Sequence, residues 1–336
     1  MSTGLVAAIG MALAFAFTNG VHDAANAIAT LVATRGARPG PAVALSAVFN
    51  MLGAVLVGTA VADTIAGIVT VPAASGVAVI GAGVLAATIW NVVTWRLGLP
   101  SSSGHALVGG LVGAAVVTTG LDGVNWGGLD GWHPVGVFGV LIALAVSPVI
   151  GFAFGALAAG AVRVMLRRGT RRLAEPVRGG EWVMSAALSF SHGANDAQKA
   201  MGVTAALLVA GGRLDTLSVP LWVKVASGAT LTLGTAMGGW RIVRTIGRRI
   251  FHLHPIDGFS SQTASTAVIL ASSFVGAPVS TTHVVASSVV GVGVGRRRWR
   301  HVRWAVVRTM GFAWIATLPV AAALGAVIGL VWDGVA

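Results

Sequence analysis

Two carboxylates lie within long apolar segments, where an acidic side chain needs a polar partner or a function. Asp23 and Asp196 each follow a glycine by three residues, and Asn26 or Lys199 stands three residues further on. Residues three apart share a helix face, so each aspartate has a polar neighbour on its own face. An ionisable group at the centre of a membrane helix costs at least ~2.5 kcal/mol. Two such positions favour a functional site over a pair of structural ion pairs, although the latter stays open.

Two runs of hydroxyl residues form a second group that could bind a ligand. Ser101 to Ser103 follow Gly98-x-Pro100, and Ser280 to Thr282 follow Gly276-x-Pro278. Glycine and proline end a helix, so each run stands where a new helix begins. The free N–H groups and the positive dipole end of a helix start attract anions. Such residues can also be plain helix caps. His105 and His283, which come next, are either proton carriers or core residues.

Both groups occur twice in the same order, which indicates an internal repeat. The segment from Phe17 to Ala27 (FTNGVHDAANA) matches the segment from Phe190 to Ala200 (FSHGANDAQKA), and GLPSSSGH at 98–105 matches GAPVSTTH at 276–283. The aspartates are 173 residues apart and the two histidines that end the second match are 178 apart. The chain therefore consists of two related halves.

The composition is that of an integral membrane protein. Only 10% of the 336 residues are charged and 55% are hydrophobic, against about a quarter charged in soluble domains. Ten apolar stretches are candidate membrane segments: 4–33, 41–61, 76–97, 105–120, 135–162, 182–210, 221–240, 259–275, 283–295 and 304–332. The net charge of +12 comes from arginines in the short segments between them, which argues against nucleic-acid binding.

Several function classes are excluded by what the sequence lacks. There is no cysteine for thiol or iron–sulfur chemistry, and there is no P-loop, HExxH motif or nucleophile elbow. We therefore expect no enzyme, no cofactor and no dedicated metal site. If the chain moves a solute across the membrane, the missing nucleotide-binding motif means that an ion gradient drives the movement or that the movement is passive.

The arginines also predict the topology. They cluster at 35–38, 163–178, 241–249 and 296–303, and these segments are expected on the cytoplasmic side. The arginine-rich and arginine-poor connections fall on opposite sides of the membrane only if 76–120 and 259–295 are re-entrant helical hairpins, which return to the side that they entered from. The predicted fold is an all-α membrane protein of two inverted-topology repeats, each with a broken first helix. The first repeat spans 1–162 and the second 182–336, with a basic cytoplasmic linker at 163–181 and both termini external.

At these motifs the sequence resembles the inorganic phosphate transporter (PiT) family, in particular its bacterial low-affinity branch. The resemblance is carried by NGVHDAANA at 19–27, SHGANDAQKA at 191–200, PSSSGH at 100–105 and PVSTTH at 278–283. It implies phosphate symport through two facing hairpins. The implied phosphate site is Ser102, Ser103, Gly104, Ser280, Thr281 and Thr282, with Gly104 departing from the hydroxyl pattern. The implied coupling site is Asp23, Asn26, Asn195 and Asp196.

The coupling ion is predicted from the difference between the two aspartate motifs. Lys199 replaces the asparagine of the first motif, and an ammonium has no lone pair to offer a cation. His22, next to Asp23, has an unperturbed pKa of ~6.5 and suits proton exchange. We therefore expect import of phosphate with protons across the cell membrane. Sodium coupling, sulfate as the substrate, an anion channel, co-transport of a divalent metal and a homodimer remain alternatives.

Overall fold

The computed structural model of the protein describes residues 2–130, 133–165, 167, 174–297 and 299–333. Arg168, Arg171, Arg172 and Arg298, which belong to the predicted cytoplasmic segments, lie outside the described residues. The first half contains α1 (Thr3–Ala33), α2 (Pro39–Leu56), α3 (Ala60–Ala66), α4 (Ala73–Leu97), α5 (Ser103–Thr119), the 3₁₀ turn η1 (Leu121–Gly123), the strands β1 (Gly128–Asp130) and β2 (His133–Val135), and α6 (Gly136–Met165).

The second half has the same order of helices. It contains α7 (Ala174–Ala210), α8 (Leu221–Met237), α9 (Trp240–Arg244), the π-helical turn η3 (Thr245–Arg249), α10 (Pro255–Phe274), α11 (Thr281–Gly295), the 3₁₀ turn η4 (Trp299–His301) and α12 (Trp304–Asp333). The only β structure among the described residues is one antiparallel pair with Gly128 opposite Val135 and Asp130 opposite His133, and an isolated bridge between Val69 and Val124.

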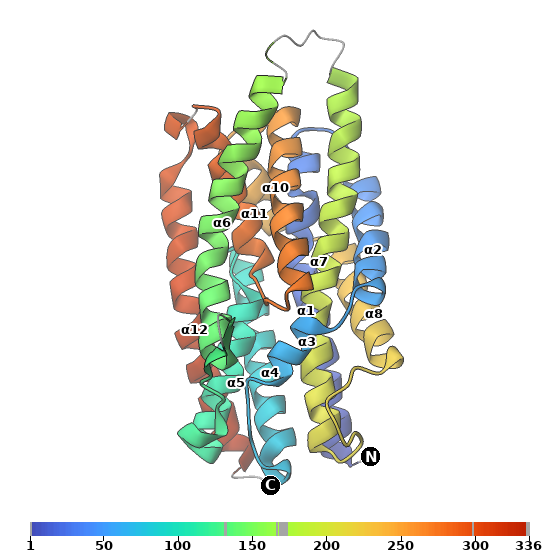
Figure 1. Cartoon of the computed structure of the whole chain (residues 1–336), viewed down its shortest axis with the longest axis vertical. Coiled ribbons are helices and arrows are strands. Elements are labelled where there is room, and N and C mark those ends of the chain that lie inside the picture. Colours follow the sequence, from blue (N-terminus) through green and yellow to red (C-terminus); the bar gives the residue numbers. More distant parts are fainter. Residues whose placement is uncertain (1, 131–132, 166, 168–173, 298, 334–336) are drawn as a thin grey trace.

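The two halves run in opposite directions through the molecule. The start of α1 and the end of α12 lie at one end of the bundle, here called the terminal end, and the end of α6 and the start of α7 lie at the other, here called the linker end (Figure 1). The hairpin of α4 and α5 occupies the terminal half, whereas the hairpin of α10 and α11 occupies the linker half. The predicted all-α fold with two repeats and two opposed hairpins is confirmed.

The predicted break in the first helix of each repeat is absent. α1 continues through Gly20 and α7 continues through Gly193. These glycines serve close packing instead: a Cβ at Gly20 would lie 2.1 Å from the Leu231 carbonyl oxygen of α8, and one at Gly193 would lie 2.0 Å from the Asn50 carbonyl oxygen of α2. Each first helix therefore packs directly against the second helix of the other repeat.

Each hairpin turns at a glycine in the left-handed region. Gly98 has φ +68° and Gly276 has φ +73°, a conformation that glycine adopts without steric cost. Each turn bonds back to the helix before it, since Leu99 N donates to Thr94 O and Ala277 N donates to Ser272 O. The chain then passes a proline and enters the next helix three residues later. This local sequence sets where both hydroxyl runs stand.

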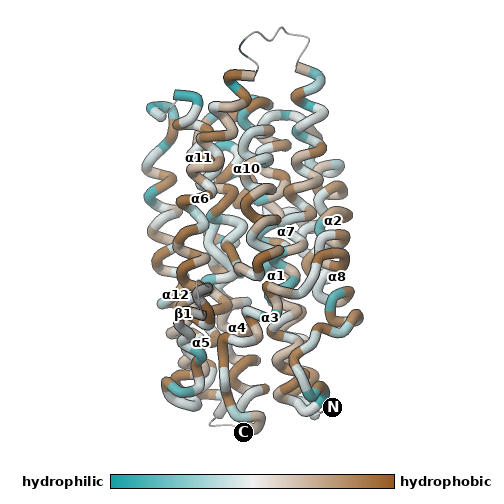
Figure 2. Tube along the Cα trace, viewed as in Figure 1, coloured by the Kyte–Doolittle hydropathy of each residue, from teal (hydrophilic) through white to brown (hydrophobic). Residues whose placement is uncertain are grey.

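The apolar core is divided into two parts by a polar layer. One cluster, with Leu5, Phe15 and Leu207, lies towards the terminal end, and the other, with Ile28, Ile246 and Phe251, lies towards the linker end. Among the described helices, α1, α2, α4, α6 and α12 are long and apolar enough to cross a membrane. Hydrophobic residues predominate along the outer helix α6 (Figure 2). The polar residues between the two clusters are thus held in the middle of the bundle.

Candidate functional site

Asp23 lies between the two hairpin tips and contacts both. Its Oδ2 accepts a hydrogen bond from Ser103 Oγ at 3.1 Å, at the start of α5. Its Oδ1 accepts one from Thr282 Oγ1 at 2.8 Å, at the start of α11, and lies 2.7 Å from His22 Nδ1. The carboxylate is almost completely buried. One aspartate on α1 thus joins elements that are far apart in the sequence.

Asp196 has the equivalent position on α7 and a different set of partners. Its Oδ2 accepts from Thr281 Oγ1 at 2.7 Å, and its Oδ1 accepts from Lys199 Nζ. The His192 Nε2 atom lies 2.9 Å from Oδ2, close enough for an ion pair but without hydrogen-bond geometry. Lys199 also donates to the Val279 carbonyl oxygen at 3.1 Å, in the second tip. The ammonium therefore neutralises this carboxylate inside the protein.

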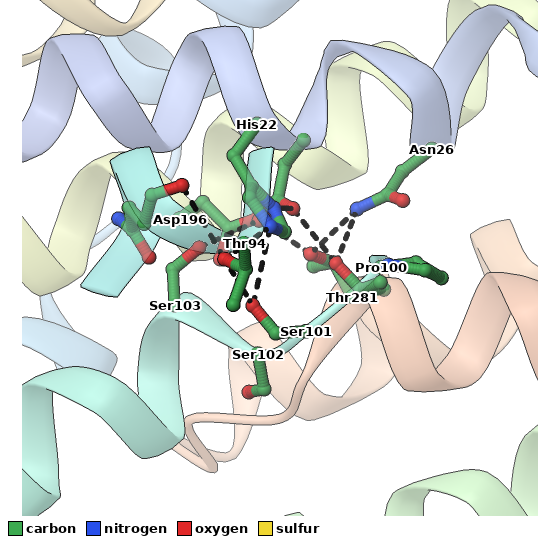
Figure 3. Close-up of polar contacts among 12 residues, drawn as sticks. His22, Asn26, Thr94, Pro100, Ser101, Ser102, Ser103, Asp196 and Thr281 are labelled. Atoms are coloured by element: carbon green, nitrogen blue, oxygen red, sulfur yellow. Dashed lines mark hydrogen bonds and ion pairs between the residues drawn. The ribbon is translucent and has the colours of Figure 1, made fainter. Parts of the chain in front are cut away.

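The predicted coupling residues do not all meet at one point. Asn26 Nδ2 donates to Thr282 Oγ1 at 3.0 Å and to Thr281 Oγ1 at 3.3 Å (Figure 3). Asn195 instead donates to Ser273 Oγ at 3.1 Å, at the end of α10. The Oδ1 atoms of both asparagines have no hydrogen-bond partner among the described residues. These two buried oxygens are unused acceptors.

Apart from Ser101, the hydroxyls of the two tips divide into two kinds. Ser102 Oγ accepts from His105 N at 3.2 Å and Ser280 Oγ accepts from His283 N at 3.3 Å, so both residues cap the helix that they start. Ser103, Thr281 and Thr282 donate to the aspartates instead. Gly104 lies beside Lys199, whose Nζ would be 3.5 Å from a Cβ at that position.

Comparison with known proteins identifies the family. The model of the phosphate transporter family matches residues 19–177 and again residues 167–325, one match for each half. The chain belongs to the phosphate transporter family. It is therefore a multi-pass membrane protein related to transporters. The resemblance to the bacterial low-affinity branch is confirmed by relatives described below.

Two curated relatives and one solved structure illustrate the similarity. The "Probable low-affinity inorganic phosphate transporter" of Bacillus subtilis is 39% identical over 320 residues, covering 94% of this chain and 93% of that protein. The protein of the same description from Rhizobium meliloti is 40% identical, covering 99% and 97%. The solved structure titled "The sodium-dependent phosphate transporter" matches with a TM-score of 0.85 and 25% identity, covering all of both chains.

In this member of the family, His22 belongs to a polar chain that the motif alone did not reveal. Its Nε2 atom lies 3.2 Å from Thr94 Oγ1 and 3.2 Å from Ser101 Oγ, and Ser101 donates to Thr94 at 2.9 Å (Figure 3). Thr94 comes from the last turn of α4 and was not predicted. Its only sequence signal was a hydroxyl close to the hairpin turn.

Two buried amides connect the second aspartate motif to neighbouring helices, one from outside the motif and one from within it. The Oδ1 atom of Asn50, on α2, lies 3.0 Å from His192 Nδ1, and its Nδ2 donates to Thr235 Oγ1 at 3.0 Å. Gln198 Oε1 accepts from the backbone N–H groups of Val61 and Ala62 at the start of α3. Sequence reasoning missed both. Asn50 could have been predicted, because it is a single amide within an apolar segment.

A cavity of about 400 Å³ lies against the backbone of the second tip. Asp63 and Thr64 of α3, Gly139 of α6, and the backbone of the second tip at 276–278 contribute to its wall. Ligand atoms of Asp23, His192 and Asp196 lie within 4.8 Å of one another in the buried layer beyond it. The geometry combines a carboxylate pair, hydroxyl donors and a lysine, which is suited to holding an anion next to a proton or a cation.

Proposed function

We propose that this chain imports inorganic phosphate by symport with protons. Phosphate would be bound between the tips by Ser103, Thr281 and Thr282, with the helix starts that Ser102 and Ser280 cap and the backbone at Gly104. Asp23 and His22 would carry the proton. The remaining coupling residues, Asn26, Asn195, Asp196 and Lys199, would shape the site around them. The role is transport, and no enzymatic activity is proposed.

One observation carries this proposal: the hydroxyls that would hold phosphate are bonded to the carboxylates. A hydroxyl has one proton to donate, so it cannot serve a carboxylate and a phosphate oxygen at once. Protonation removes the charge of Asp23 and weakens it as an acceptor. Ser103 and Thr282 are then free to bind phosphate. Proton binding and phosphate binding become positively coupled, which symport requires.

The charges of the site also support a cation partner. Asp196 is paired with Lys199, whereas the neighbours of Asp23 are two hydroxyls and His22. A phosphate anion that enters this buried layer meets the negative charge of Asp23, which is paired with no lysine or arginine among the described residues. Like charges in a low-dielectric site repel strongly and favour uptake of a proton. Neutralising Asp23 is therefore the electrostatic condition for phosphate to bind.

Sodium coupling is the second candidate, and a specific observation favours it. The free Oδ1 atoms of Asn26 and Asn195 are oxygen ligands of the type that a hard cation needs. Against it, Lys199 occupies the second aspartate, and an ammonium at that position repels sodium. Protons therefore stay the preferred coupling ion for this chain.

The orientation that we propose puts the linker end in the cytoplasm and both termini outside the cell membrane. The arginine-rich segments at 35–38, 241–249 and 296–303 support it, because short cytoplasmic loops carry an excess of arginine. The proposed repeats keep the boundaries 1–162 and 182–336. In this orientation the cavity beside α3 and the second tip is the outer approach to the site.

The proposal is tested by radiolabelled phosphate uptake into proteoliposomes with an imposed gradient of either protons or sodium. Uptake should rise with an inward proton gradient and persist without sodium. Asp23→Asn should abolish the stimulation by protons, whereas Asp122→Asn, an exposed aspartate, should leave it unchanged. Strict dependence on sodium at fixed pH would contradict proton coupling. Stronger inhibition by sulfate than by unlabelled phosphate would contradict phosphate as the substrate, and adding divalent metal tests co-transport.

A further inference from the structure

A second buried carboxyl lies at the linker end, well away from the aspartates. Glu181 on α7 is 0% exposed. Thr34, just after α1, donates to its Oε1 at 2.8 Å, and Oε2 has no hydrogen-bond partner among the described residues. A Cβ at Gly258 would lie 2.1 Å from Oε1 and one at Gly36 would lie 2.9 Å from Oε2. The carboxyl is thus enclosed between α7, the end of α1 and the start of α10.

The charged groups around Glu181 do not compensate it. Asp257 on α10 is a second acid, and it uses the available cation, because Arg296 after α11 donates to it at 2.5 Å. Asp257 also accepts from the backbone N–H of His254 at 2.9 Å. Arg178, one turn earlier on α7, is largely exposed and lies 3.6 Å from Glu175. Glu181 is therefore an acid without an ion-pair partner among the described residues.

Such an environment favours the protonated form. Glu181 lies just outside the predicted membrane segment, which begins at Trp182. The pKa of Glu181 is raised to about 8, chiefly by burial; the Thr34 hydrogen bond and Arg178 lower it by smaller amounts, and Asp257 makes the smallest contribution, which raises it. Below that pH the group is neutral and fits its enclosure. Above it, a carboxylate would be buried with the Thr34 hydroxyl as a hydrogen-bond donor but without a cation, which is unfavourable unless water reaches it.

We propose that Glu181 is a proton-binding site, separate from the substrate site, that holds the linker end closed while protonated. The neutral carboxyl lets α1, α7 and α10 pack together. Loss of the proton forces hydration of Glu181, and hydration requires these helices to separate. The device exists at one end only, because the position related to Glu181 by the 173-residue repeat is Ala8, which lies in the apolar cluster of the terminal end.

The physiological role of Glu181 rests on the proposed function, since opening at the linker end would release phosphate and a proton to the cytoplasm. The experiment that tests the site does not depend on that function. The chain has no cysteine, so a single cysteine is a specific reporter. Ser185, one turn after Glu181, is 0% exposed and donates to the Ala27 carbonyl oxygen of α1 at 2.9 Å. Ser185→Cys therefore reports whether α1 and α7 have separated.

The experiment measures the rate at which a maleimide modifies Ser185→Cys in purified protein without phosphate, from pH 7 to pH 9. The intrinsic reactivity of a thiol rises with pH, so each rate is divided by the rate in a Glu181→Gln background at the same pH. For a group with a pKa of about 8, the deprotonated fraction is about tenfold larger at pH 9 than at pH 7. We expect the ratio to rise about tenfold, and Glu175→Gln, on an exposed acid of the same helix, should not alter this rise.

A ratio that stays constant across this range would overturn the inference. If Glu181→Gln does not fold, Thr34→Val replaces it, because removing the hydroxyl that favours the charged form should move the rise in modification to higher pH. An unmoved rise would also overturn the inference. Because phosphate is absent throughout, a failure here is distinguishable from a failure of phosphate or proton transport, which the uptake assay reports.

Discussion

Ser103 and Thr281 occupy equivalent positions in the two repeats and do the same thing. Each follows the cap of its helix and donates to the aspartate of its own repeat. The next position breaks the symmetry, because Thr282 crosses to Asp23 whereas Gly104 has no side chain and leaves room for Lys199. Asp23 is therefore held by both tips, and Asp196 by one tip and an ammonium.

Removing either equivalent hydroxyl should weaken phosphate binding. A hydrogen bond to a charged group contributes about 1.5 to 3 kcal/mol, so Ser103→Ala and Thr281→Ala should each raise the Kd for phosphate about tenfold or more. Isothermal titration of the purified protein measures this. Thr204→Ala is a suitable control, since Thr204 is buried on α7 but bonds only within its own helix. Unchanged affinity in both tip variants would leave the hydroxyls with a structural role alone.

At the scale of elements, the glycines of the first helices act together with partners in the second helices. Gly20 and Gly234 allow α1 to contact α8, and Gly193 and Gly53 allow α7 to contact α2. At each of these four positions a Cβ would lie 2.0 to 2.1 Å from a backbone carbonyl oxygen of the other helix. Backbone atoms cannot move aside as side chains do. The contacts therefore depend on the absence of a side chain.

We expect Gly193→Ala to destabilise the protein by about 1 to 3 kcal/mol or more, because overpacking forces the two backbones apart. Gly10→Ala is the matched control: this glycine lies within α1 and has open space around it, so alanine should be neutral or slightly stabilising there. Thermal unfolding in detergent compares them. A melting temperature for Gly193→Ala equal to that of the unaltered protein would show that the α2–α7 contact tolerates a methyl group.

The sequence predicted these elements unequally, for physical reasons. Both hairpin turns were predicted from a glycine followed two residues later by a proline, because this pair ends a helix. The pairs are Gly98 with Pro100 and Gly276 with Pro278. A glycine inside an apolar helix is ambiguous, since it either breaks the helix or lets another approach. Gly20 was therefore interpreted as a break and proved to be a contact. The partners of His22 and His192 escaped prediction because they come from α4 and α2, and only packing brings them together.

At the scale of the whole molecule, the orientation in the membrane is the main prediction. Cysteines placed singly at Asp122 and Asp215, in the connections at the terminal end, should react with an impermeant maleimide in intact cells. Cysteines at Arg178 and Arg300, which the arginine asymmetry puts in the cytoplasm, should react only after permeabilisation. Labelling of Arg178→Cys in intact cells would reverse the orientation. Because the native chain has no cysteine, no background has to be removed.

The interlocked packing of first and second helices has a consequence for biosynthesis. When the ribosome has made only the first half, α1 lacks α8 and α2 lacks α7, so the surfaces around Gly20 and Gly53 face lipid. Asp23 then has Ser103 but not Thr282. The early half cannot complete its own interior and must remain loosely assembled in the bilayer until the second half is inserted with the opposite polarity. The final step of assembly is thus the mutual docking of two incomplete halves rather than the addition of a finished domain to another.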